Sequence, residues 1–185
     1  MGEQRKKHNR REHLNDFHLN VAGEYVYDGA LYACQNDDAK QRRSKRAVWG
    51  MAAILTVAVA AGGCIPAPGM QHCFYVLLPY LGEFLGAASV IWALAKLGMD
   101  WGTVREYNYK KSVAVLPVRT AVTAVFSLLG IVCELIFFFV NDHAGQTFFA
   151  LLYVLLKLIA LLSALVLRAE IMQAEWDKLP KKNNF

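Results

Sequence analysis

Three ionisable residues lie within stretches of sequence that otherwise carry almost no charge: Glu83, Glu134 and Lys157. Ionisable side chains are rare inside membrane-spanning helices, because each costs roughly 2.5–3.5 kcal/mol at mid-helix. One amine can pair with one of two carboxylates, and the acid left over would take up a proton or a small cation at low dielectric constant. The chemistry to expect from these residues is therefore charge compensation inside a bilayer, or proton or cation coupling.

Small and polar side chains accompany the three charges at helical spacing. This supporting face comprises Pro79, Gly82 and Gly86 around Glu83, Thr123, Ser127 and Gly130 before Glu134, and Tyr153 before Lys157. Small residues allow helix backbones to approach closely in lipid. Counted from the predicted helix ends at about 1.5 Å per residue, the charges lie at overlapping depths of roughly 9–15 Å. We therefore expect the three faces to meet, with Lys157 between the two carboxylates.

This intramembrane charge cluster has three interpretations that the sequence leaves open. In the first, Lys157 pairs with one acid and the other acid is protonated, so that the cluster fixes the register of the helices. In the second, the excess carboxylate binds a proton or cation and forms part of a transport pathway. In the third, the polar groups contact a transmembrane helix of a partner protein.

Four apolar segments are long enough to position these residues across a membrane. The hydrophobic fraction of the chain is 56%, above the roughly 45–50% of soluble domains. A helix needs about 20 apolar residues to cross the hydrocarbon core, and the expected spans cover about 47–65, 74–97, 113–140 and 147–167. The predicted fold is an all-α membrane protein, a four-helix transmembrane bundle at 47–167. The last helix is expected to continue into the tail, because Met172, Trp176 and Leu179 recur at helical spacing.

The distribution of Lys and Arg predicts the orientation of the spans. The connections at 66–73 and 141–146 contain neither residue, whereas the leader 1–46, the loop 98–112 and the tail 168–185 contain several. By the positive-inside rule, both termini and the middle loop are cytoplasmic, and we expect a multi-pass protein of the plasma membrane. The net charge of +5 then reflects topology, so we expect contact with the lipid bilayer and not with nucleic acid.

The leader contains a predicted β-hairpin at residues 24–33. Asp28 and Gly29 form a two-residue turn of the kind that favours hairpins, and this turn sets Tyr25 opposite Tyr32. An isolated hairpin is only marginally stable in water. We therefore expect it either to cover the cytoplasmic ends of the helices or to serve as a docking site for another protein.

Two cysteines flank the first outer connection, Cys64 and Cys73. The compartment outside the cytoplasm permits disulfides, so these residues are candidates for a bridge between the first two spans. Two small residues that fill space between helices would explain them equally well.

The sequence contains no motif that predicts catalysis. Ser-His-Asp sets, HExxH, P-loop and GxGxxG patterns are lacking, so we expect no enzyme, no cofactor and no metal site. We expect an accessory or assembly component that presents its cytoplasmic segments to a protein partner. The alternative is a small homo-oligomeric transporter or channel that uses the Glu/Glu/Lys cluster for proton or cation coupling.

Overall fold

Four long helices dominate the structure, which is a computed structural model describing residues 17–19, 23, 25–27, 29–35, 37–98, 101–141 and 147–179. They are α2 (Asp38–Cys64), α4 (Phe74–Leu97), α6 (Leu116–Val140) and α7 (Thr147–Met172). All four are long and apolar enough to cross a membrane. This confirms the prediction of four helices able to span a membrane. The second predicted span matches α4, whereas α2 begins at Asp38 and so carries the basic run 40–46 within the helix.

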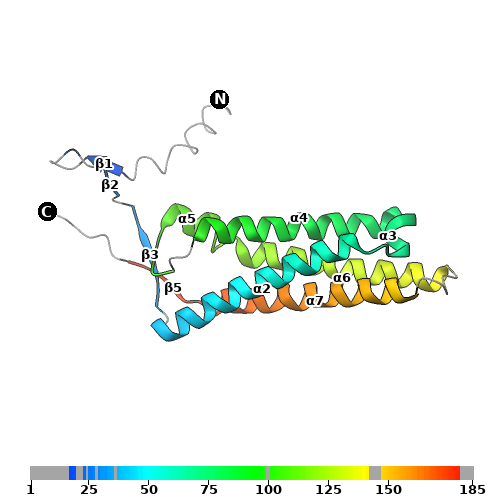
Figure 1. The fold of residues 1–185 in the computed structure, drawn as a ribbon. Helices are drawn as coiled ribbons and strands as arrows, with labels where there is room; N and C mark the ends of the chain where they lie inside the picture. Colours follow the sequence, from blue (N-terminus) through cyan, green and yellow to red (C-terminus); the bar gives the residue numbers. More distant parts are fainter. Residues whose placement is uncertain are drawn as a thin grey trace, which may run out of the picture.

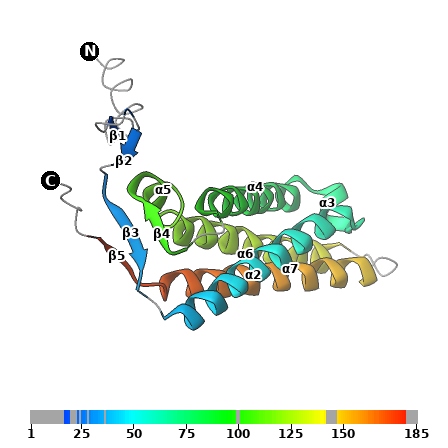
Figure 2. The same cartoon turned by 60° about the vertical axis from the view of Figure 1, so that its left-hand side comes forward.

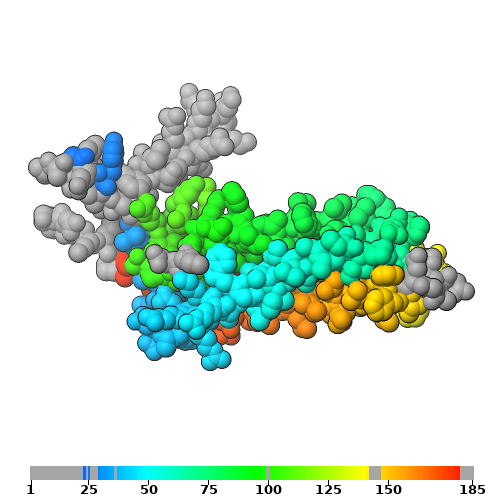
Figure 3. All heavy atoms as spheres, viewed as in Figure 1, coloured from blue at the N-terminus to red at the C-terminus, as the bar shows by residue number. Residues whose placement is uncertain are grey.

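The long helices lie side by side along most of their length (Figure 1). Each of α2 and α6 packs against both α4 and α7, and on the face drawn in Figure 3 atoms of α2, α4 and α7 meet along the length of this bundle. Alanine and valine form much of the buried core between them. Such small side chains bring helices close together, which is how helices associate in lipid without a hydrophobic driving force.

At one end of the bundle, three segments that are far apart in the sequence form a small antiparallel sheet. Its strands are β3 (Leu31–Cys34), β4 (Thr103–Arg105) and β5 (Trp176–Lys178), in the order β4-β3-β5. One strand precedes α2, one follows α4 and one follows α7 (Figure 2). We call this the sheet end, and the opposite end, where the short helix α3 (Pro68–His72) lies, the α3 end.

An aromatic cluster attaches this sheet to the bundle. Tyr32 of β3 stacks on Tyr109 of the short helix α5 (Glu106–Lys111), with ring centroids 4.2 Å apart and planes within 2°. Trp176 of β5 lies 6.0 Å from Tyr109 and 6.3 Å from the buried ring of Trp101. Aromatic pairs at such distances add stability beyond the area they bury, so the sheet is a fixed part of the fold.

The predicted hairpin over residues 24–33 is wrong. Strand β2 (Tyr25–Tyr27) pairs with β1 (Phe17–Leu19), and β3 pairs with β4 and β5 instead. Tyr25 therefore does not oppose Tyr32, while Asp28 of the predicted turn lies outside the described residues. Long-range pairing prevails because β3 gains two neighbouring strands and the stacking contact of Tyr32, whereas a hairpin alone is marginal.

The predicted continuation of the last helix through the tail is also wrong. Helix α7 ends at Met172, and Trp176 to Lys178 form β5. Met172 remains exposed, so the apolar stripe that suggested a helix is not buried on one face. Trp176 instead lies opposite Cys34 in the sheet and packs on the aromatic cluster.

Helices α4 and α6 approach closely at two glycines of the predicted supporting face. A β-carbon added at Gly82 would lie 2.6 Å from ring carbons of Phe126, and one added at Gly86 would lie 3.3 Å from the backbone Cα of Thr123. Any larger side chain at Gly86 would push the two helices apart. The small face on α4 therefore sets the distance to α6.

We expect Gly86→Ala to destabilise the protein by about 1–3 kcal/mol, because the added methyl group overpacks the contact with Thr123. Gly50→Ala is the matched control, since a β-carbon there meets nothing within 4 Å. It should stabilise α2 by up to about 1 kcal/mol through helix propensity. Thermal melting in detergent measures both, and equal effects of the two changes would contradict the close approach at Gly86.

Candidate functional site

A buried ion pair between Glu83 of α4 and Lys157 of α7 lies in the interior of the bundle. Lys157 Nζ donates a hydrogen bond to Glu83 Oε2, and Ser127 Oγ of α6 donates to Glu83 Oε1 at 2.6 Å. The side chains of Glu83, Lys157 and Ser127 are almost completely inaccessible to solvent. Both oxygens of the Glu83 carboxylate therefore have a donor, and one interaction network connects three helices.

Two tyrosine rings complete the surroundings of the lysine. Lys157 Nζ lies 4.6 Å from the ring centroid of Tyr80 and 5.0 Å from that of Tyr153. A cation over an aromatic face is attracted by the ring quadrupole, most strongly when both are removed from water. Tyr80 in turn donates a hydrogen bond to the backbone oxygen of Val59 on α2, at 3.5 Å. Through Tyr80, the ion pair also contacts the fourth helix.

Glu134 is also buried completely, but it does not belong to this ion pair. Neither of its carboxylate oxygens has a hydrogen-bond partner among the described residues. Gly69 of α3 packs against it, since a β-carbon added there would overlap Oε2 and lie 3.0 Å from Cδ. The backbone N–H of Gly69 approaches this carboxylate without reaching hydrogen-bond geometry. The hydroxyl group of Tyr153 is likewise buried and unpartnered in the described part of the chain.

The prediction that Lys157 lies between two carboxylates is therefore only half right. Lys157 pairs with Glu83 alone, and Glu134 forms a separate site next to α3. The reason is axial distance: Glu134 follows Ser127 by seven residues, or about 10 Å of helix rise. Since Ser127 is level with Glu83, a single lysine head group at Glu83 does not also reach Glu134.

The other residues of the predicted supporting face lie in or beside the interior of the bundle. Pro79, Gly86, Thr123, Gly130 and Tyr153 are buried, and Gly82 is partly buried. The hydroxyl group of Thr123 donates a hydrogen bond to the backbone oxygen of Arg119 at 2.9 Å, so its donor is paired within α6. A β-carbon at Gly130 would lie 3.6 Å from Lys157 Cε and 4.0 Å from Tyr153 Oη. The face thus provides room for Lys157 to cross toward α4.

Three residues of the site were missed by the sequence analysis: Tyr80, Gly69 and Gly63. The ring of Tyr80 occupies the space where a side chain at Gly63 would lie. A β-carbon added at Gly63 would lie 2.8 Å from Tyr80 Cζ. Tyr80 precedes Glu83 by three residues and so shares its helix face, which is a signal available in the sequence. Gly69 gave no such signal, because it reaches Glu134 only through the fold of the connection between α2 and α4.

The two cysteines flanking that connection are free thiols in the structure. Cys64 is exposed at the end of α2, whereas Cys73, just before α4, is partly buried. The candidate disulfide is therefore not formed in the structure.

The arrangement of ionisable groups can compensate charge and can hold a proton at Glu134, but it offers no ligand set. Among the residues that the structure describes, no three His, Cys, Asp or Glu side chains are placed to hold a metal ion. The site therefore consists of an ion pair between Glu83 and Lys157 and a separate carboxyl group, that of Glu134, next to α3. The chain matches no protein-family model, no curated protein and no solved structure.

Proposed function

We propose that this chain is an accessory or assembly component of the plasma membrane. In this proposal, the four helices anchor a cytoplasmic platform, the sheet β4-β3-β5, which binds a partner protein. The chain acts by binding rather than by catalysis, with both termini in the cytoplasm.

The observation that carries the proposal is the construction of the sheet from three distant segments. The segment before α2, the loop after α4 and the segment after α7 each contribute one strand to this sheet. The strands β4 and β5 are the outer strands of this sheet, and the outer strand of a sheet is a common site for adding a strand of another protein. A fold that joins both terminal segments and one loop into one surface suits a docking role.

The interior of the bundle supports an anchoring role. Glu83 and Lys157 compensate each other, and Ser127 completes the hydrogen bonding. A buried pair of this kind is weak evidence for stability, because desolvation offsets the attraction. Its more general value is that it disfavours other helix registers, since slipping one helix would leave a charge unpaired in lipid.

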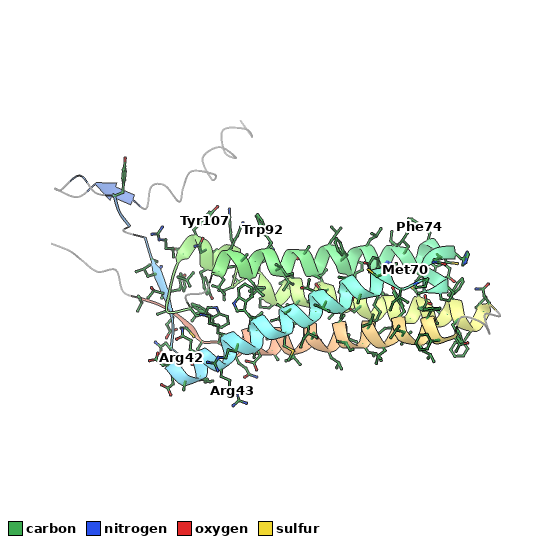
Figure 4. The ribbon with its side chains drawn as sticks, in the orientation of Figure 1. Arg42, Arg43, Met70, Phe74, Trp92 and Tyr107 are labelled. Atoms are coloured by element: carbon green, nitrogen blue, oxygen red, sulfur yellow. The ribbon has the colours of Figure 1, made fainter. Side chains whose placement is uncertain are left out.

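The distribution of basic and aromatic side chains supports a cytoplasmic sheet end. Figure 4 shows Arg42, Arg43, Trp92 and Tyr107 toward this end of the molecule, with the exposed ring of Phe74 at the other. Basic residues concentrate on the cytoplasmic side of membrane proteins, and Trp and Tyr mark the interface. Both patterns agree with the orientation expected from the loops.

Lysines at the sheet end also behave as interfacial residues. Lys96 Nζ lies 5.2 Å from the ring centroid of the exposed Trp92. Lys111 Nζ donates a hydrogen bond to Tyr107 Oη at 2.6 Å. Lysines near helix ends in membranes extend their amines toward the head groups, so these contacts support a membrane boundary near the end of α4.

A tagged pull-down from native membranes, quantified by mass spectrometry against an untagged control, tests the docking role. We expect one partner at near-equal stoichiometry with the wild-type chain. Tyr32→Ala should reduce its recovery at least about tenfold, because the stacking on Tyr109 that attaches the sheet is lost. Tyr25→Ala is the matched control, since Tyr25 is exposed and belongs to β2, outside this sheet.

The result would count against the proposal if the chain came down alone as a defined oligomer. Equal recovery of the partner with Tyr32→Ala and wild type would show that the sheet is not the docking surface. Loss with Tyr25→Ala as well as Tyr32→Ala would point to the β1–β2 pair instead. In each case the amount of the variant in the membrane fraction is measured first, so that a lower amount of the chain is not mistaken for weaker binding.

One observation favours a second candidate, a small homo-oligomeric proton-coupled transporter. Glu134 is a buried carboxyl group without a partner among the described residues, and intramembrane acids of this kind often carry protons in transporters. In this candidate Glu134 alone binds the proton, since Glu83 is held by Lys157. Proton flux into liposomes containing the purified chain, compared between wild type and Glu134→Gln, tests it.

A further inference from the structure

A groove opens on the membrane-facing side of α6 near the sheet end. Its volume is about 440 Å³, and it is lined by Pro117, Val118, Ala121, Val122, Val125 and Phe126 of α6 together with Arg168 of α7. The α6 residues run from Pro117 to Phe126, which corresponds to about 14 Å of helix rise. Every lining residue except Arg168 is apolar, so the groove offers a hydrocarbon surface with one cation beside it.

The guanidinium group of Arg168, which lines the groove, is a cation without a partner among the described residues. Arg119 of α6, which lies between the groove residues Val118 and Ala121 in the sequence, donates a hydrogen bond to the backbone oxygen of Ser89 at 2.6 Å. Arg168 is partly buried and has no hydrogen bond or ion pair with a described residue. Glu170, the nearest acid along α7, accepts a hydrogen bond from Ser44 of α2 at 3.1 Å. The guanidinium group is therefore available to an anion from outside the chain.

We propose that this groove binds one anionic phospholipid of the leaflet at the sheet end. The phosphate group pairs with Arg168, and one acyl chain lies along the apolar residues of α6. Arg168 lies four residues before the end of α7, so its depth suits a phosphate at the membrane boundary. A guanidinium group forms paired, charge-assisted hydrogen bonds with phosphate oxygens, and an apolar groove with a basic group at its rim fits a lipid better than a free anion.

Native mass spectrometry of the full chain in detergent tests this proposal. The delipidated protein is titrated with phosphatidylglycerol or with phosphatidylcholine that has the same acyl chains. We expect the first bound lipid to be phosphatidylglycerol, with a preference of about tenfold. Arg168→Gln should abolish this preference, and Val122→Phe should weaken binding of the anionic lipid by filling the groove while keeping the charge.

Two control variants separate the site from general effects. Arg42→Gln removes an exposed cation from α2 at the same end of the molecule, and should preserve the preference. Val57→Phe enlarges an exposed residue of α2 outside the groove, and should also preserve it. An equal loss with Arg42→Gln and Arg168→Gln would mean diffuse attraction and would overturn the proposal. Absence of any preference in wild type, or unchanged binding in Val122→Phe, would overturn it too.

Discussion

Lys157→Met is expected to destabilise the protein by about 3–5 kcal/mol, because it leaves the carboxylate of Glu83 buried without its counter-charge. Methionine has nearly the length of lysine and fills the same space between α4 and α7. The loss therefore measures the missing charge and not a cavity. Ser127 still donates to one carboxylate oxygen, but a single neutral donor does not replace an ammonium group. Thermal melting in detergent, supported by denaturant titration, measures the change.

A double-mutant cycle isolates the contribution of the ion pair. Adding Glu83→Gln to Lys157→Met should recover most of the loss, since the remaining amide carries no charge and keeps the hydrogen bond from Ser127. Adding Glu134→Gln to Lys157→Met should instead be additive within about 0.5 kcal/mol, because Glu134 does not share the pair. Recovery by Glu134→Gln would show that Lys157 serves both carboxylates.

The sequence was sufficient to predict the four long apolar helices and the proximity of Glu83 and Lys157. Long apolar segments leave few alternatives, because a polar backbone in lipid must be satisfied within a helix or a closed barrel. An ionisable group within such a segment then requires a compensating group at a similar depth. Counting 1.5 Å per residue from the helix ends was enough to align Glu83 with Lys157.

The same counting could not separate Glu134 from the pair. The predicted depths of the three charges overlapped, and a lysine side chain is long enough to bridge a small offset. Which of the two acids the lysine selects depends on the axial offset between α6 and α4, which sets Ser127 level with Glu83 and places Glu134 farther along the same helix, next to Gly69. That offset is set by packing contacts between helices, and the small face gave no way to rank the two choices.

The strands were beyond prediction for a different reason. A local turn signal at Asp28–Gly29 favoured pairing between neighbours in sequence, whereas the observed partners of β3 lie about 70 and 145 residues away. Each partner strand has only three residues, too few to produce a periodic pattern. Trp176 was assigned to a helical stripe in the tail, yet it packs with Tyr109 and Trp101 in the cluster that attaches the sheet.

Glu83→Gln is expected to destabilise the protein and Glu134→Gln is not, although both neutralise a completely buried glutamate. Glu83→Gln leaves Lys157 charged and without a counter-ion, which should cost about 3–5 kcal/mol. Glu134→Gln removes no hydrogen bond formed by a described residue and keeps the shape of the side chain. It also abolishes the cost of burying an isolated acid. We therefore expect a melting temperature equal to or above that of wild type.

The Glu134→Gln variant also separates the two candidate functions. Natural proteins keep an unsatisfied buried polar group where function requires it, so a stabilising change at such a position commonly reduces activity. If the chain is an accessory component, Glu134→Gln should capture the partner as well as wild type does. If Glu134 carries protons, the stabilised variant should lose proton flux in liposomes. A clear destabilisation by Glu134→Gln would contradict both expectations, because it would show that the carboxyl group forms an interaction that an amide cannot replace.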